Sequence, residues 1–297
     1  MRYDAVIIGG SFAGLSAATY IARARRLVCI VDTGSPRNRF TSHSHGLFAH
    51  DGSEPAAILA AARSQVRRYP TTTFVGTGAA SASIRSGGFS VRLTSGEVLE
   101  ATRLVLAFGI SDELPAIPGL AERWGRSVLH CPYCHGYEFS GRRLGVLSVS
   151  SASAHQAMLI AEWGPTTLYL NGGADPDSAA LVELRRRGVA LEPAPVRALH
   201  GDGDQLSAIE LADGRTSAVD ALYLGPRTHL NSDIAQQLGC ELAEGRFGPV
   251  IRTDDSRMTT VPGVYAAGDI TRDAHNVTWA CADGVTAGTA VHRSLVF

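Results

Sequence analysis

The feature that most constrains the fold is a β-turn-α-β pattern that occurs twice along the chain. The first copy consists of the apolar run YDAVIIG, a glycine-rich turn, the helical stretch LSAATYIARARR and a second apolar run, LVCIVD. The second copy reads RLGVLSV, SSASAHQAMLIAEWG and TTLYLN. A buried strand that passes through a turn into a helix and a second strand is typical of a Rossmann-type unit. We therefore predict two related nucleotide-binding folds in one chain.

A constant offset aligns the two copies without a gap. At the positions that matter for nucleotide binding, Gly9, Ser11, Gly14 and Asp32 lie opposite Ser148, Ser150, Ser153 and Asn171. Each copy is followed by a stretch that we interpret as two strands around a turn and then a third, apolar strand. These stretches read FSVRLTSGEVLEATRLVLAFG and LSAIELADGRTSAVDALYLGP.

The end of the chain does not belong to the second copy. The segment TTVPGVYAAGDI predicts a strand that ends in Gly268 and Asp269, and a helix from about Thr278 to His292 closes the chain. The simplest arrangement inserts the second fold into the first. We predict an α/β protein of two Rossmann-like, three-layer ββα domains, with residues 1–114 and 228–297 in the first and 115–227 in the second.

The turn GGSFAG of the first copy resembles the dinucleotide-binding pattern Gly-x-Gly-x-x-Gly, with Ser11 at the second glycine position. In that pattern the glycines permit a tight turn, close approach of a pyrophosphate and close packing of the helix. The start of the helix then offers N–H groups to the phosphates. Asp32 follows the next strand, where a carboxylate can bind ribose hydroxyls or serve as an ordinary turn residue. The predicted contacts with a dinucleotide are Gly9, Ser11, Phe12, Ala13, Gly14 and Asp32.

The stretch HCPYCHGYEF carries a Cys-x-x-Cys pair, Cys131 and Cys134, followed directly by His135. This spacing suits a c-type haem attachment, half of a zinc site or a redox-active disulfide. Haem attachment needs export, and the N-terminus lacks the pattern of a signal peptide. Structural zinc needs two more ligands at suitable spacing, and there is no second Cys-x-x-Cys. We therefore favour a redox disulfide and expect no metal site.

Four motifs together resemble the FAD-dependent pyridine nucleotide-disulfide oxidoreductases, specifically the branch of the low-molecular-weight thioredoxin reductases. They are VIIGGSFAG, AFG in place of the usual Ala-Thr-Gly, CPYCHG and GVYAAGD, in this order over nearly the whole chain. The resemblance implies FAD as the cofactor. The loop SHSHGLFAHDG lines the flavin in relatives, although its histidines could equally be exposed loop residues. The further FAD contacts that the resemblance implies are Asn38, His45, Gly46, Ala107, Phe108, Gly109, Gly268, Asp269, Asn276, Val277 and Thr278.

The resemblance also implies roles for the cysteine pair. Cys134 faces the flavin, and Cys131 exchanges with the substrate disulfide. Thioredoxin reductases usually have Asp after the pair, whereas this chain has His135, an imidazole that we expect to titrate near neutrality and to exchange a proton with a thiol. The Cys-x-x-Cys-His form is also similar to dithiol oxidases that close disulfides in natural products such as gliotoxin and holomycin. Glu138 could orient His135 or cap a helix turn, and we favour the cap.

The inserted domain of thioredoxin reductases binds NADPH with a glycine-rich turn and a basic cluster. Here three serines add Cβ atoms at all three glycine positions. Asn171 replaces the carboxylate expected for NAD, while Asp175 and Asp177 would repel the 2′-phosphate of NADP. We predict that this domain keeps its fold but has lost ordinary NADPH binding.

The predicted function is an FAD-dependent dithiol–disulfide oxidoreductase. Its substrate is expected to be a small dithiol or disulfide or a thioredoxin-like protein, and its electron partner oxygen, ferredoxin or flavodoxin. One alternative is an NADPH-dependent thioredoxin reductase. Another, of a different class, is a non-catalytic flavoprotein that senses redox state.

Composition bears on partners and location. The formal net charge is −1 and there is no long run of one sign, so we expect neither nucleic acid nor a membrane surface as a partner. No apolar run reaches the length of a membrane span, and we expect a cytoplasmic protein. Cys29, Cys240 and Cys281 are interpreted as buried small apolar residues. The family resemblance further implies a homodimer.

Overall fold

The computed structural model describes residues 2–173 and 176–297 and divides into two compact units. Unit 1 comprises Met1–Arg39, Glu54–Ser111 and Thr228–Phe297, and unit 2 comprises Phe40–Ser53 and Asp112–Arg227. Segment 40–53, which we expected with the first domain, groups with unit 2. The reason is tertiary contact, because Phe40 packs against Gly125 and His45 lies beside Glu138.

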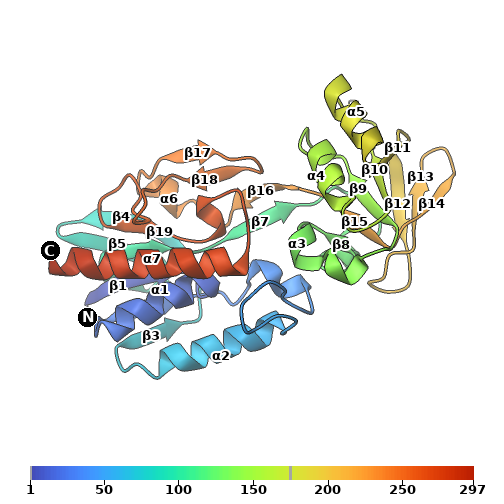
Figure 1. The fold of residues 1–297 in the computed structure, drawn as a ribbon. Helices are drawn as coiled ribbons and strands as arrows, with labels where there is room; N and C mark the ends of the chain where they lie inside the picture. Colours follow the sequence, from blue (N-terminus) through green and yellow to red (C-terminus); the bar gives the residue numbers. More distant parts are fainter. Residues whose placement is uncertain (1, 174–175) are drawn as a thin grey trace. The chain divides into compact units, whose positions relative to one another are not determined.

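Unit 1 is organised by a largely parallel sheet with the strand order β3-β2-β1-β6-β5-β4. Figure 1 labels β1, β3, β4 and β5 among these strands. Its strands are β1 (Arg2–Ile8), β2 (Val28–Val31), β3 (Thr72–Val75), β4 (Ala79–Arg85), β5 (Gly88–Leu93), β6 (Val98–Leu106) and β19 (Val264–Ala266). Its other elements are α1 (Phe12–Arg23), η1 (Arg37–Phe40), α2 (Pro55–Arg67), α6 (Ile234–Gln237), β17 (Leu242–Glu244), β18 (Pro249–Ile251), η4 (Asp269–Thr271) and α7 (Val277–Val296).

The strand β1 appears in the sequence as an uninterrupted apolar run because the sheet is covered on both faces. Ala5 and Ile7 are buried beneath the helices α1, α2 and α7, while Val6 and Ile8 are buried on the opposite face of the sheet. Alternate side chains of a strand point to opposite faces, so a strand covered on both faces is apolar at every position. The sheet therefore lies between two apolar layers.

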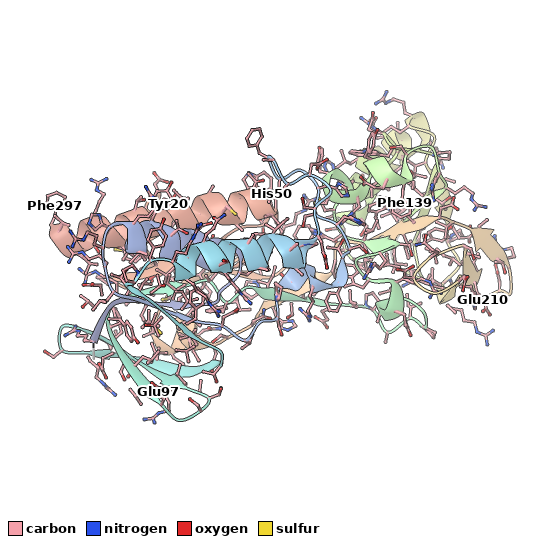
Figure 2. All side chains as sticks on the ribbon, turned by 90° about the horizontal axis from the view of Figure 1, so that it is seen from below. Tyr20, His50, Glu97, Phe139, Glu210 and Phe297 are labelled. Carbon is pink, nitrogen blue, oxygen red and sulfur yellow. The ribbon has the colours of Figure 1, made fainter. Side chains whose placement is uncertain are left out.

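The strand β6 differs from our expectation of a separate second and third strand in this stretch. It is one continuous strand whose beginning pairs with β5 in antiparallel direction and whose end pairs with β1 and β19 in parallel direction. Glu97 precedes it in the turn after β5 (Figure 2). In the second copy Asp220 bonds the main chain and side chain of Arg143 between the corresponding strands. In the second copy this aspartate separates β14 from β15. No such residue interrupts β6, which is therefore one continuous strand.

Unit 2 contains a parallel sheet with the strand order β11-β10-β9-β15-β8 and a smaller antiparallel sheet. The parallel strands are β8 (Val128–Leu129), β9 (Leu144–Leu147), β10 (Thr166–Tyr169), β11 (Ala190–Glu192) and β15 (Ala221–Tyr223). The remaining elements are η2 (Ala121–Arg123), α3 (Pro132–His135), η3 (Tyr137–Phe139), α4 (Ser153–Ile160), α5 (Ser178–Arg186), β12 (Val196–His200), β13 (Ala208–Leu211) and β14 (Thr216–Ala218).

The layers of unit 2 follow from the alternation along β9. Leu144 and Val146 pack with residues of α4 and α5, and Leu147 packs with residues of β12 and β13. Helices, parallel sheet and antiparallel sheet thus form three layers, which confirms the predicted ββα architecture. The chain passes between the units through β7 (Ile110–Glu113) and β16 (Arg227–Leu230), which pair with each other. Among the described residues, no helix is both long and apolar enough to span a membrane.

Candidate functional site

The turn between β1 and α1 has the geometry that the first sequence copy predicts. Gly9 has a φ of +112°, and a Cβ on it would lie 2.1 Å from the carbonyl oxygen of Ala107. A Cβ on Gly14 would lie 1.8 Å from the carbonyl oxygen of Gly9. Only glycine fits at either position, so the turn, the helix and the chain after β6 approach one another closely. Ser11 takes the N-cap position of α1.

Asp32 lies at the end of β2 and belongs to this turn. Its Oδ1 accepts a hydrogen bond of 3.1 Å from the backbone N–H of Gly10, and its Oδ2 pairs with the guanidinium of Arg63. Arg63 also donates to the carbonyl oxygen of Gly10 over 3.2 Å. A carboxylate and a guanidinium are thus held beside the turn, where ribose hydroxyls and phosphates could bind them.

The returning tail contributes to the same edge of the sheet. Gly268 has a φ of +87° and lies next to Ala13 at the start of α1. Asp269 follows it and forms an ion pair with Arg37, with 3.1 Å between Nη1 and Oδ2. Asn38 lies next to Arg37 in η1 and is half-buried. The tail therefore closes over the first turn of α1.

The helix α7 begins where the sequence indicates. The Oδ1 of Asn276 accepts a hydrogen bond of 2.7 Å from the backbone N–H of Thr278, a standard N-cap interaction. About two turns later the carboxylate of Asp283 is 2% exposed and is held by Arg257 at 2.6 Å and by Arg272 at 2.9 Å. These two ion pairs fasten the segment before the helix to the helix itself.

These features fit a dinucleotide such as FAD. Two glycines that tolerate no Cβ leave the main chain of the turn open to a pyrophosphate, and α1 and α7 both start at this edge. Ala107 touches the turn, and Asn231 bonds the backbone of Phe108 and Gly109. The predicted contacts that unit 1 brings to this edge are Gly9, Ser11, Phe12, Ala13, Gly14, Asp32, Asn38, Ala107, Phe108, Gly109, Gly268, Asp269, Asn276, Val277 and Thr278. His45 and Gly46 belong to unit 2, and their contact with FAD stays a prediction.

The cysteine pair lies in unit 2, at the start of the short helix α3. Cys131 is the residue before the helix, Cys134 lies inside it, and both are half-buried. The aromatic rings of Tyr133 and Trp163 pack edge to face with 5.7 Å between their centroids. The other cysteines differ, since Cys29 and Cys240 are buried as predicted and Cys281 is half-buried.

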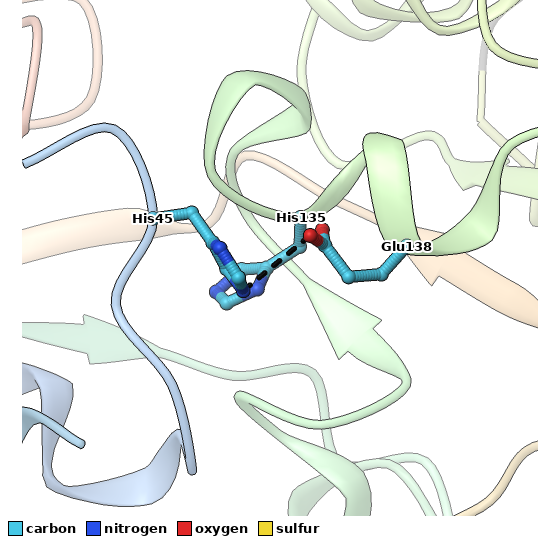
Figure 3. A group of neighbouring side chains, drawn as sticks. All are labelled: His45, His135 and Glu138. Carbon is cyan, nitrogen blue, oxygen red and sulfur yellow. Dashed lines mark ion pairs between the residues drawn. The ribbon is translucent and has the colours of Figure 1, made fainter. Parts of the chain in front are cut away.

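His135 ends α3 and lies beside His45 and Glu138 (Figure 3). Its ring meets the ring of His45 edge to face, with 5.8 Å between the centroids. The Nε2 of His45 is 3.4 Å from the Oε1 of Glu138. Glu138 thus pairs with a histidine of segment 40–53, and the helix cap that we favoured for it is not observed in η3.

Burial lowers the pKa of His135 to about 4, the nearby His45 acts in the same direction, and Glu138 opposes the shift. The expectation that His135 titrates near neutrality is therefore wrong. Desolvation disfavours the imidazolium form. At neutral pH the ring is neutral and offers a lone pair rather than a positive charge.

Tyr223 supports the cysteine segment from below. It ends β15, is fully buried and donates a hydrogen bond of 3.3 Å to the carbonyl oxygen of His135. Burial raises the pKa of its hydroxyl, and Cys131, Glu138 and Cys134 act in the same direction. The tyrosine therefore stays protonated and keeps donating to the backbone of the motif.

In the turn between β9 and α4, the hydroxyl of Ser153 bonds the backbone N–H groups that precede it. The Oγ of Ser153 accepts hydrogen bonds from the backbone N–H groups of Val149, at 3.1 Å, and Ser150, at 3.3 Å. The helix α4 starts at Ser153, two residues later than α1 does in the aligned first copy. Two N–H groups of this turn are thus bonded to a side chain of the helix that follows it.

The residues after β10 also serve the fold. Asn171 has a φ of +52°, and its Oδ1 accepts a hydrogen bond of 2.9 Å from the backbone N–H of Val196. Asp177 caps α5 by accepting from the N–H of Ala180 over 2.8 Å. Asp175 lies outside the described residues. The position that corresponds to Asp32 is therefore committed to a structural hydrogen bond.

The sequence did not reveal Arg63, Tyr223 or the partnership of His45 with Glu138. Arg63 lies on the polar side of α2, where an arginine is ordinary. Tyr223 occurs in an apolar strand and resembles any core aromatic residue. His45 was noticed only through the family resemblance, because the position of a loop depends on tertiary contacts that no local pattern encodes.

Residues 3–284 match the family described as pyridine nucleotide-disulphide oxidoreductase. The thioredoxin reductase sirT of Leptosphaeria maculans is 32% identical, with 98% of this chain and 93% of that protein covered. The crystal structure of an oxidoreductase from Agrobacterium tumefaciens superposes with a TM-score of 0.95 at 44% identity, covering 100% of this chain and 99% of that one. The crystal structure of HlmI gives a TM-score of 0.93 at 36% identity, covering 99% and 93%.

Proposed function

Because the chain belongs to the pyridine nucleotide-disulphide oxidoreductase family, we propose that it oxidises a small dithiol to a disulfide through Cys131 and Cys134 without using NADPH. Membership confirms the predicted family, the enzyme class and FAD as the cofactor. The identity of the substrate, the independence from NADPH and the electron acceptor are the parts that we propose.

The observation that carries the proposal is the closed turn of the second copy. Ser153 satisfies two backbone N–H groups there, and Asn171 is bonded to Val196. A nucleotide phosphate would have to displace the serine hydroxyl and would meet Cβ atoms where the family has glycine. The electrons of the flavin are therefore expected to come from the cysteine pair.

The thiol chemistry is thiol–disulfide exchange. One thiol of the substrate attacks the Cys131–Cys134 disulfide and forms a mixed disulfide with Cys131, which releases Cys134 as a thiol. The second substrate thiol then attacks this mixed disulfide, so that the substrate leaves as a disulfide and Cys131 becomes a thiol. Two protons leave the substrate in these two steps, and two are taken up by the cysteines. The neutral ring of His135, directly after Cys134, is the acceptor that we assign to a thiol proton.

FAD, which the turn residues Gly9 and Gly14 and the carboxylate of Asp32 would hold, would supply the two-electron chemistry that links the dithiol pair to a final acceptor. We propose oxygen as the acceptor, because His135 stands where thioredoxin reductases carry Asp. The balanced reaction is dithiol plus oxygen to disulfide plus hydrogen peroxide. A reduced ferredoxin or flavodoxin that drives the opposite reaction, toward thioredoxin, is the second candidate. A homodimer and a cytoplasmic location stay predictions.

The test uses the holoenzyme under anaerobic conditions with dithiothreitol as the small dithiol. The flavin absorbance near 450 nm is expected to fall on mixing and to return with one equivalent of peroxide when oxygen is admitted. In Cys131→Ser and Cys134→Ser proteins the rate of bleaching should fall at least about a hundredfold, whereas Cys281→Ser should react like the unchanged protein. Equal rates in all four proteins would refute the assignment to the pair, and return of the flavin without peroxide would refute oxygen as the acceptor.

A further inference from the structure

Three side chains of unit 2 bring metal-ligating atoms together outside the cysteine pair. They are His45 from segment 40–53, His135 at the end of α3 and Glu138 in η3, and one ligand atom of each lies within 4.8 Å of the others (Figure 3). The zinc site considered from sequence would have used the two cysteines. This group uses a different set of ligands, and only its fold brings His45 to it.

The spacing of these atoms suits a small tetrahedral ion. In a tetrahedral zinc site with bonds of about 2.0–2.1 Å, neighbouring ligand atoms are roughly 3.3–3.5 Å apart. The Nε2 of His45 and the Oε1 of Glu138 are 3.4 Å apart, which already equals one edge of such a tetrahedron. A ring nitrogen of His135 lies within 4.8 Å of these two atoms, so the ring would have to turn toward them to occupy the third corner.

A second carboxylate lies behind the group. The Oδ1 of Asp51 is 3.6 Å from the Nδ1 of His45, the ring nitrogen that does not face Glu138. The same Oδ1 accepts a hydrogen bond of 2.8 Å from the backbone N–H of Gly46 and so holds the loop in place. Metal-bound histidines commonly donate their other ring N–H to a carboxylate, which fixes the ring and strengthens the ligand. The position of Asp51 therefore fits a histidine that binds through Nε2.

We propose that His45, His135 and Glu138 form a Zn²⁺ site that inhibits the enzyme when it is filled. Two imidazoles and one carboxylate are ligands that zinc prefers, and three protein ligands leave one position for water or a thiolate. A metal on His135 takes the lone pair that would otherwise accept a thiol proton. It also ties segment 40–53 to the segment that carries the cysteines.

The inhibitory effect rests on the function proposed above, whereas metal binding does not. The two parts therefore need separate readouts. Binding is measured by titrating Zn²⁺ into the FAD-loaded protein, with calorimetry and a competing zinc dye as the detectors. The background is Cys131→Ser/Cys134→Ser, in which the thiols cannot hold the ion.

In this background one Zn²⁺ per chain is expected to bind. His45→Gln and Glu138→Gln should each weaken binding by at least about 10–100-fold, and Asp51→Asn by about tenfold because it removes only the supporting carboxylate. The matched control is His50→Gln, an exposed histidine of the same loop outside the group, which should leave the affinity unchanged. Flavin absorbance and far-UV circular dichroism establish that each variant is folded.

Loss of zinc binding in the double-serine protein with full binding in the unmodified protein would overturn the site and assign the ion to the thiols. Equal affinity in His45→Gln, Glu138→Gln and His50→Gln would also overturn it. Because dithiothreitol itself binds Zn²⁺, the free concentration of the ion is set with a zinc buffer. In the unmodified enzyme, free Zn²⁺ should stop flavin reduction by dithiothreitol, an excess of a stronger chelator should restore it, and His45→Gln should require at least about tenfold more free Zn²⁺. Binding to the three ligands without any effect on flavin reduction would leave the site standing and refute its inhibitory role.

Discussion

The two β-turn-α units of this chain hold the backbone N–H at one aligned position with side chains from different elements. In unit 1 the N–H of Gly10 is held by the carboxylate of Asp32, at the end of the next strand. In unit 2 the N–H of Val149, at the aligned position, is held by the hydroxyl of Ser153 from the helix itself. The residue aligned with Ser153 is Gly14, which has no side chain to offer.

Glycine in one turn and serine in the other explain how a nucleotide-binding turn can lose its ligand and keep its fold. Glycine at the third position lets the helix pack closely against the end of the strand, where a Cβ on Gly14 would meet the carbonyl oxygen of Gly9. Serine at that position fills the space with a Cβ and satisfies the donors with its own oxygen, so the turn stays stable without a ligand. The residue after the second strand follows the same division, because Asn171 bonds Val196 instead of the turn.

The largest effect is expected when Gly14 of unit 1 is replaced by serine, the residue at the aligned position of unit 2. Gly14→Ser would place a Cβ 1.8 Å from the carbonyl oxygen of Gly9 and 3.3 Å from the side chain of Ile7. We expect a protein that fails to retain FAD or to accumulate in soluble form. The measurement is the ratio of flavin to protein absorbance after purification. Gly76→Ser is the matched control, since a Cβ there meets nothing within 4 Å; full flavin content in Gly14→Ser would contradict the account.

Removal of the carboxylate from the first turn should have the next largest effect. Asp32→Ala takes away the partner of the Gly10 N–H and of Arg63, together with the proposed acceptor for ribose. Hydrogen bonds to charged groups contribute about 1.5–3 kcal/mol, so FAD affinity should fall by about 10–100-fold. Titration of the apoprotein with FAD measures this. The control is Asn171→Ala at the aligned position, and an equal loss in both proteins would argue against a role in the cofactor site.

Replacing the serines of the turn between β9 and α4 by glycine should have the opposite effect, a gain of nucleotide binding in unit 2. The triple change Ser148→Gly, Ser150→Gly and Ser153→Gly frees the N–H groups of Val149, Ala152 and residue 150 and removes three Cβ atoms. With each hydrogen bond contributing about 1 kcal/mol, NADPH should bind about tenfold more tightly or better. Fluorescence of bound NADPH reports the affinity, with Ser151→Gly as the control in the same turn. No gain over Ser151→Gly would mean that the serines are not what closes this turn.

The smallest effect concerns Asn171 itself. Asn171→Ala loses the hydrogen bond to Val196 and strains a φ of +52°, for a combined cost of about 2 kcal/mol in the free energy of unfolding. Asn171→Gly removes the strain and keeps the loss of the hydrogen bond, so it should cost about 1 kcal/mol less than Asn171→Ala if the strain is real. Chemical denaturation compares the three proteins. An Asn171→Ala protein as stable as the unchanged one would deny the structural role.

The sequence predicted the duplicated units because strand burial and glycine spacing are local properties. The run YDAVIIG became β1 since both faces of the sheet are covered, and the offset between the copies pointed directly to Ser153. It did not predict that β6 is continuous, because whether a strand breaks depends on what its side chains bond, as at Asp220. The surroundings of His135 were also missed: its lowered pKa follows from burial and from His45, which lies 90 residues away in the sequence.

The most direct test of the central claim compares two reductants on the same holoenzyme without oxygen. NADPH at micromolar concentration is added first, then dithiothreitol, and flavin absorbance is followed throughout. We expect the flavin to stay oxidised with NADPH and to lose its absorbance with the dithiol. Rapid bleaching by NADPH would contradict this expectation, since the turn that Ser153 closes would then still bind the nucleotide.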